Sequence, residues 1–168
     1  SRPLNCGALS AGQITALLPA QIAALSNAQV AAISVGALSG LTAAQIPSFS
    51  PAQIGALTAP QMAAFSTAQI GALTGPQLDA LSGDQLTALT DAEVGALGAL
   101  QIAALLPAQI AELQPREIAD LAAAQLQALT TAQMQALTLP QIGALSVAQI
   151  GALGAAQIAA PRYPAHCC

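Results

Sequence analysis

The residues that could do chemistry lie near the two ends of the 168-residue sequence. Cys6 is close to the start, and His166, Cys167 and Cys168 close the chain. Thiols and imidazole can bind zinc, but adjacent ligands are unusual and the sequence has no C-x₂-C pair. A Cys–His nucleophile would lack an orienting acid beside it. Three cysteines are an odd number, which in a secreted protein points to disulfides between chains, although Cys167 and Cys168 could also pair with each other.

An octapeptide repeat must position these cysteines. It is clearest at residues 50–57, SPAQIGAL, and it continues from Gln13 to Gln157 as 19 consecutive octads without insertion or deletion. The fourth position is Gln in 16 octads, the fifth is apolar in all 19, and the eighth is Leu, Ile or Phe in 18. A fixed period of this length predicts a repeat architecture.

The repeat divides the chain into three segments. Residues 1–9 form an N-terminal segment, 10–160 the array of 19 octads, and 161–168 a cysteine-rich tail of different composition. Cys6 is in register with the apolar fifth position, so the alternative to a disulfide is a small apolar side chain in the first coil. The tail holds the only His and the only Tyr, which suggests a specific contact.

Each octad predicts one short helix with its own N-cap. The first position is Ser or Thr in 13 of 19 octads, and Ser/Thr-x-x-Gln is a capping box, in which hydroxyl and amide each satisfy a free backbone N–H. Proline occurs at the second position, where its missing N–H costs nothing. The cap pairs that show the pattern best are Ser50 with Gln53, Thr58 with Gln61, Ser66 with Gln69, and Thr130 with Gln133.

Two other architectures fit the pattern less well. A continuous helix would lose about 3 kcal/mol at each interior proline. A β-solenoid would need strand alternation, whereas the apolar fifth and eighth positions are three residues apart, as on one helix face. We therefore predict an all-α fold, an α-solenoid of very short capped helices that pack mainly on adjacent units. The number of octads per turn stays open. The expected core includes Ile54, Leu57, Ile70, Leu73, Ile142 and Leu145.

Some positions depart from the consensus. Pro47 falls at a sixth position, inside a predicted helix, and predicts a local kink or a truncated helix. Phe49 and Phe65 replace Leu at eighth positions, where a core role is expected. Met62 and Met134 also lie at core positions.

All seven acidic residues lie between Asp79 and Asp120. Because they occupy several different octad positions, we expect a solvated face in preference to a cation site or an acidic docking band. Arg116 is four residues from both Glu112 and Asp120, a spacing that predicts exposed ion pairs along one helix.

The composition narrows the function classes. Charged residues make up 6% of the chain, hydrophobic residues 55%, and the net charge is −4. Such a surface favours self-association. Three arginines and no lysine exclude a phosphate-binding stripe, so no nucleic-acid partner is expected. No apolar run approaches the 18 residues or so of a transmembrane helix. We expect no enzyme activity, cofactor or metal.

Geometry then suggests a filament. The first and last coils of a straight solenoid lie tens of ångströms apart, whereas a disulfide needs Cα atoms within about 7 Å. Cys6 would therefore reach Cys167 or Cys168 of another copy. Neither end shows the polar cap that keeps solenoids soluble. We expect an extracellular structural subunit that stacks head to tail. The alternatives are a monomeric surface adhesin or binding solenoid and, less favoured, an ice-binding array of Ser/Thr rows.

The string ALTxAQIxALS resembles octapeptide arrays of very large bacterial surface proteins that are labelled haem-utilisation or adhesion proteins. Close variants of it lie at residues 56–66, ALTAPQMAAFS, and 128–138, ALTTAQMQALT, and the resemblance covers residues 10–160. The resemblance implies a location at the cell surface, contacts with cell-surface components, and an adhesive or scaffold role. The haem part of the label finds little support, because the array offers only Met62 and Met134 as axial ligands.

Overall fold

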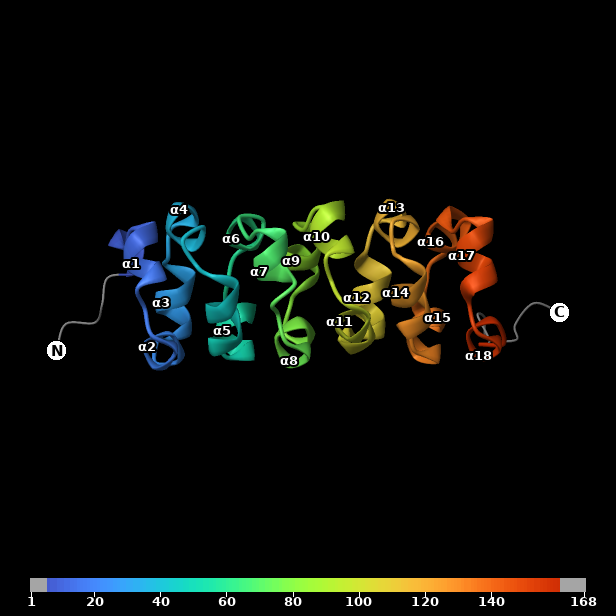
Figure 1. Ribbon diagram of the computed structural model, residues 1–168, viewed down its shortest axis with the longest axis horizontal. Helices are drawn as coiled ribbons and strands as arrows, with labels where there is room; N and C mark the ends of the chain where they lie inside the picture. Colours follow the sequence, from blue (N-terminus) through green and yellow to red (C-terminus); the bar gives the residue numbers. More distant parts are fainter. Residues whose placement is uncertain (1–5, 161–168) are drawn as a thin grey trace.

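The computed structural model describes residues 6–160, and within this range every octad contains one short helix (Figure 1). No α-helix there exceeds six residues. The elements, in order, are η1 (Cys6–Ala8), α1 (Ala11–Thr15), α2 (Pro19–Ala23), α3 (Asn27–Ala31), α4 (Val35–Leu38), η2 (Ala43–Ser48), α5 (Pro51–Gly55), α6 (Ala59–Met62), α7 (Thr67–Ile70), α8 (Gly75–Asp79), α9 (Gly83–Thr87), α10 (Asp91–Gly95), α11 (Ala99–Ala104), α12 (Pro107–Glu112), α13 (Pro115–Ala119), α14 (Ala123–Ala128), α15 (Thr131–Ala136), α16 (Leu139–Ala144), α17 (Val147–Ala152) and α18 (Ala155–Ile158).

The residue at the first octad position bends the chain between helices. Ser50, for example, has extended backbone angles, φ −70° and ψ 157°, immediately before α5. Its hydroxyl accepts a hydrogen bond from the backbone N–H of Gln53 at 3.2 Å, and Pro51 occupies the first helical position. Because the same extended residue recurs in each octad, the helices stay short and the chain turns after each one.

The short helices form a superhelix in which each helix packs on the third one after it. The contacting pairs include α11 with α14, α12 with α15 and α13 with α16. The prediction that packing would be mainly between adjacent octads is wrong. Three to four octads complete one turn, so the unit that stacks on a helix is three octads away in sequence.

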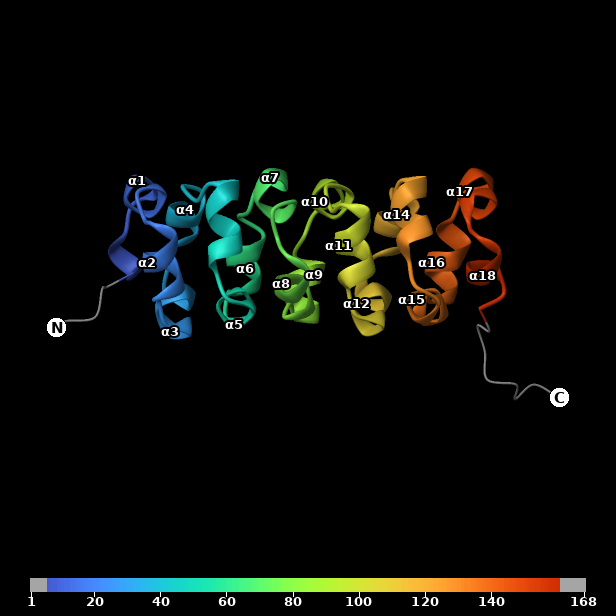
Figure 2. The ribbon, with the colours of Figure 1, turned by 60° about the horizontal axis from the view of Figure 1, so that its bottom comes forward.

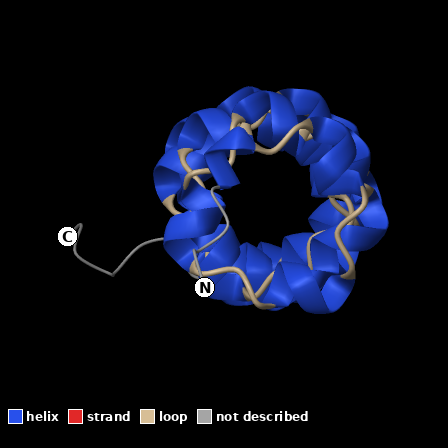
Figure 3. Cartoon of the chain, turned by 90° about the vertical axis from the view of Figure 1, so that its left-hand side faces the viewer, coloured by secondary structure: helices blue, strands red, loops and turns tan. Residues whose placement is uncertain are grey.

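Viewed along its long axis, the molecule is a ring of helices (Figure 3). Figure 1 and Figure 2 show these turns advancing along that axis, with α1 at one end and α18 at the other. The two ends of the described range are therefore far apart.

Fifth- and eighth-position side chains make up the core. Ile54 and Ile70 are fully buried, and Leu57 and Leu73 nearly so. Ile142 and Leu145, which the repeat pattern also places in the core, are only partly buried. The physical reason is their position in the last turn, where no following turn among the described residues covers them.

The irregular octad around Pro47 forms the six-residue 3₁₀ helix η2 instead of an α-helix, and this helix contains Pro47 and is not truncated. Its last core residue, Phe49, is buried, and so is Phe65. Within residues 6–160 no helix has the length and hydrophobicity that a bilayer crossing requires.

Candidate self-association surfaces

The fourth-position glutamine makes two sets of hydrogen bonds. In α9, Gln85 is 1% exposed and its Oε1 accepts the backbone N–H of Ser82 at 2.8 Å. Its Nε2 donates to the carbonyl oxygens of Ile54 at 2.9 Å and Leu57 at 2.7 Å. Those carbonyls belong to the preceding turn, 31 and 28 residues earlier. One side chain thus caps its own helix and ties it to the turn before.

Every fourth-position Gln from Gln45 to Gln157 repeats this contact. Each donates to the carbonyl 28 residues earlier, at 2.6 to 2.9 Å. Sequence reasoning predicted only the local cap. The available clue was that Gln persists where the octad has no hydroxyl, as in Gln101 after Gly98 and Gln125 after Ala122. A residue needed only to complete a capping box would have little reason to remain there.

The proposed cap pairs are present as hydrogen bonds. Besides Ser50, hydroxyls of the following residues accept from the backbone N–H three residues later at 3.2 to 3.4 Å: Thr58 from Gln61, Ser66 from Gln69, and Thr130 from Gln133. These side chains cap helices at several places along the superhelix, so they do not form a localised site.

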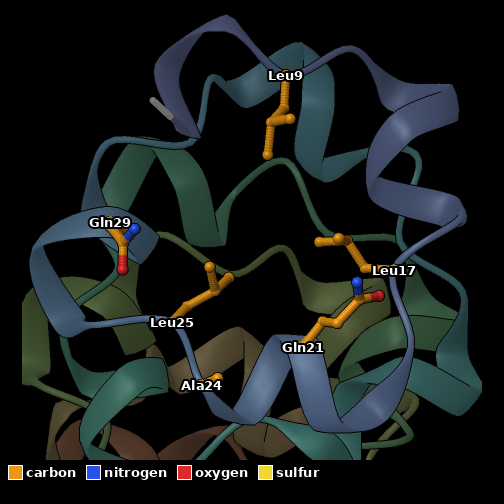
Figure 4. A pocket seen from close by; sticks show the side chains of 6 residues that line it. All are labelled: Leu9, Leu17, Gln21, Ala24, Leu25 and Gln29. Atoms are coloured by element: carbon orange, nitrogen blue, oxygen red, sulfur yellow. The ribbon is translucent and has the colours of Figure 1, made fainter. Parts of the chain in front are cut away.

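Near the N-terminal end of the described range, two glutamines have no turn among residues 6–160 that precedes them by 28 to 31 residues. Gln13 and Gln21 are exposed, and their Oε1 atoms accept the backbone N–H of Ser10 and Leu18. Their Nε2 groups donate to no group of the described chain. Beside them a cavity of about 200 Å³ opens into the core, lined by Leu9, Leu17, Gln21, Ala24, Leu25 and Gln29. Figure 4 shows Leu9, Leu17 and Leu25 pointing into this space from successive octads.

The C-terminal end carries the complementary half. Within residues 6–160 the last glutamine contact is that of Gln157 with Leu126 and Leu129. The fifth- and eighth-position carbonyls that follow therefore meet no glutamine amide of the described chain. Ile150 is 38% exposed and Ile158 51% exposed at this end. One end thus offers amide donors beside an apolar cavity, and the other offers carbonyl acceptors beside apolar side chains.

The cysteines flank these ends in sequence. Cys6 begins η1, the first element of the N-terminal turn. Cys167 and Cys168, and the alternative zinc ligand His166, lie outside the described residues. The disulfides between subunits that would join these two cysteines to Cys6 stay a prediction. Among the described residues, no group of three His, Cys, Asp or Glu side chains could hold a metal ion.

The acidic residues do not pair as their spacing suggested. Arg116 Nε lies 2.8 Å from Asp91 Oδ1, and neither Glu112 nor Asp120 is its partner. Arg116 is in α13 and Asp91 in α10, so the ion pair joins two turns of the superhelix across 25 residues. The side chains are 70% and 40% exposed, and such a pair contributes little to stability.

Two carboxylates, Glu93 and Glu117, replace Gln at the fourth position and are buried. Glu117 Oε2 accepts the backbone N–H of Gln114 at 2.7 Å, whereas its buried Oε1 has no hydrogen-bond partner. Burial raises the pKa of Glu117 above its usual value, and the nearby charge of Asp91 raises it further. The Gln114 N–H and Arg116 act in the opposite direction.

Comparison with known proteins identifies the repeat. A family model described as ALTTAQ repeat matches residues 60–91. This stretch covers α7 to α9 and parts of α6 and α10, and it includes Gln61, Gln69, Gln77 and Gln85, which bind carbonyls of the preceding turn. A search of curated proteins finds no match to the chain. The repeat itself is thus recognised, while the adhesion and haem labels of the resembling surface proteins receive no support from the comparisons.

Proposed function

We propose that this protein is the structural subunit of an extracellular filament in which copies stack head to tail. The observation that carries the proposal is the complementarity of the two ends. Within residues 6–160, the amides of Gln13 and Gln21 at the N-terminal end have no carbonyl partner, and the C-terminal end has carbonyls of the kind that such amides bind in most other octads. A second copy could therefore continue the same turn-to-turn contact.

The register of this contact follows from the internal one. If η1 of one copy follows α18 of another, Gln13 takes the place two octads beyond Gln157. Because Gln157 Nε2 binds the carbonyls 31 and 28 residues earlier, Nε2 of Gln13 would face the carbonyls two octads further along, those of Ile142 and Leu145. By the same spacing, Gln21 faces the carbonyls of Ile150 and Leu153. These four residues include the side chains that the last turn leaves partly uncovered.

Apolar burial adds to these hydrogen bonds. The cavity between Leu9, Leu17 and Leu25 lies at the N-terminal opening of the core, and Ile150 and Ile158 are exposed at the C-terminal end. Bringing the ends together would remove both apolar surfaces from water, at about 25 cal/mol for each Å² buried. Few charges oppose the approach, since only 6% of the chain is charged. When two different ends bind each other and the assembly does not close into a ring, each added copy leaves a free end. Such a contact gives a polymer and does not stop at a dimer.

The polymer is tested by sedimentation velocity and electron microscopy over a range of protein concentrations. We expect filaments whose length grows with concentration and whose width equals that of one superhelix. A single monodisperse particle at all concentrations would overturn the proposal and favour a monomeric binding solenoid.

The register is tested with Gln21→Glu. Its carboxylate can still cap α2, as Glu117 caps α13, but it would face carbonyl oxygens of the next copy and cannot donate to them when ionised. We expect shorter filaments at neutral pH. Gln114→Glu, the same change at an exposed first position in the middle of the superhelix, is the matched control and should leave filament length unchanged. Equal filament lengths for both variants would show that the ends do not join in this register.

The cysteines would make the contact covalent in an oxidising environment. Cys6 stands at the start of the N-terminal turn, and Cys167 and Cys168 follow the C-terminal turn in sequence. On a non-reducing gel we expect a ladder of oligomers that Cys6→Ser abolishes. A ladder that persists in Cys6→Ser would remove Cys6 from the cross-link without affecting the non-covalent contact.

A further inference from the structure

Glu117 stands at the fourth octad position, where most octads have Gln. It makes the cap bond of a glutamine but no bond to the preceding turn. It is 2% exposed, and its Oε2 accepts the backbone N–H of Gln114 as a glutamine Oε1 would. Its Oε1 therefore takes the place of the amide nitrogen. Among the described residues, this atom is the only buried side-chain oxygen or nitrogen without a hydrogen-bond partner.

The neighbouring octads show what that position binds. Gln109 donates to the carbonyls of Leu78 at 2.9 Å and Leu81 at 2.8 Å, and Gln125 donates to that of Leu97 at 2.6 Å. The same spacings of 31 and 28 residues assign the carbonyls of Leu86 and Leu89 to Glu117. An ionised carboxylate has only acceptors, so it cannot bind them, and its charge faces the negative ends of their dipoles.

We propose that Glu117 is an acid-responsive clamp between two turns of the superhelix. When a proton from solvent binds Oε1, the resulting O–H donates to the carbonyl oxygen of Leu89. The carboxylic acid then makes both the cap bond and a bond to the preceding turn, as a glutamine does. The turn that holds α13 is thereby tied to the turn that holds α9. This inference concerns the interior of one chain and does not depend on filament formation.

The surroundings of Glu117 agree with this role. Burial is the largest cause of its raised pKa, followed among the raising causes by the charge of Asp91. The elements that pack on α13 are α10 and α16, and the carbonyls belong to Leu86 in α9 and to Leu89 in the bend that follows it. The charged groups on these elements and beside α13 are Asp91 and Glu93 on α10, Asp84 on α9, Arg116 on α13, Glu112 at the end of α12, and Asp120 at the C-cap of α13. Helix α16 carries none.

The sign of the effect follows from linkage. A carboxyl whose pKa is higher in the folded chain than in the unfolded chain binds more protons when folded, so its contribution to stability falls as the pH rises. The contribution is fully present below the unfolded pKa, near 4.5, and is lost as the pH rises through the raised folded pKa. The clamp is thus closed in acid and open at higher pH.

The test compares urea unfolding of the wild-type protein and Glu117→Gln, at low concentration, from pH 4.5 to pH 8. The variant carries the residue that most octads have, so we expect it to fold. Its advantage over the wild type should be small at pH 4.5. As the pH rises, the unfolding equilibrium constant of the wild type should increase relative to that of the variant, by at most about tenfold per pH unit, the limit for one proton. If the stability of the wild type and that of the variant change with pH in parallel, the clamp is wrong.

Two further variants separate the clamp from a general effect of charge. Gln109→Glu places a carboxyl at an equivalent buried position and should create a second, similar loss of stability with rising pH. Glu112→Gln removes an exposed carboxylate from the neighbouring helix and should leave the pH profile almost unchanged. If Glu112→Gln flattens the profile as much as Glu117→Gln does, surface charge explains the effect and the clamp is wrong.

Discussion

At the fourth octad position, one amide side chain satisfies backbone groups of two different turns. Its oxygen accepts a cap N–H three residues earlier, and its nitrogen donates to carbonyls 28 and 31 residues earlier. Those carbonyls belong to helix ends, which always leave carbonyls without an intrahelical partner. Very short helices have proportionally more of these groups, so this fold needs a side chain that can satisfy them from outside.

We predict that Gln85→Met is strongly destabilising although Met has nearly the shape of Gln. The change leaves the Ser82 N–H and the buried Leu57 carbonyl without partners, and each such group costs about 1–3 kcal/mol. The Ile54 carbonyl loses the Gln85 bond but still accepts the backbone N–H of Leu57. Thermal or urea unfolding measures the loss. Gln13→Met is the matched control: the Gln13 side chain is exposed and, among residues 6–160, makes the local cap bond alone, so the change should cost less than about 1 kcal/mol. Similar losses in both variants would mean that the contact between turns contributes little.

Helix packing sets a second requirement, a close backbone approach between turns. A Cβ atom added at Gly40 would overlap the backbone carbonyl group of Ala11, in the helix that packs on α4. Most other octads have Ala at this seventh position. Gly40 is therefore required by the contact between α1 and α4, and its backbone conformation alone does not demand glycine.

We predict opposite effects for two glycine-to-alanine changes. Gly40→Ala should lower stability, because the rigid Ala11 backbone must move to admit the methyl group. Gly95→Ala should raise it by about 0.4–1 kcal/mol, since a Cβ there meets nothing within 4 Å and the unfolded chain loses freedom. Differential scanning calorimetry of both variants decides the point. A neutral Gly40→Ala would show that α1 and α4 have room to separate.

The whole superhelix behaves as a linear stack, because each turn contacts the next through the same groups. Stability should then be roughly the sum of repeat and interface contributions. It also follows that the length of the stack is adjustable only in steps of one octad, since a smaller step would place the apolar fifth and eighth positions on the wrong face.

We therefore predict that deletion of residues 130–137, one octad, leaves a folded superhelix with one cooperative unfolding transition and slightly lower stability. Deletion of residues 130–133, half an octad, should unpack everything that follows. Circular dichroism and urea unfolding distinguish the two. Comparable stability of the two deletions would contradict a stack that depends on an eight-residue register.

Much of this architecture could be predicted from the sequence because its causes are local. The Ser50 hydroxyl and the Gln53 backbone N–H are three residues apart, so the start of α5 is determined within one octad. The burial of Ile54 and Leu57 follows equally from their spacing on a short helix. The sequence by itself thus determined the helical class, the helix starts and the residues of the core.

The tertiary structure alone decided what depends on the number of octads in a turn. The second set of bonds made by Gln85, the ion pair of Arg116 with Asp91, and the partial burial of Ile142 all involve groups from different turns or the lack of a following turn. Small bend angles accumulate over several octads before these groups meet, and no local spacing in the sequence fixes that sum.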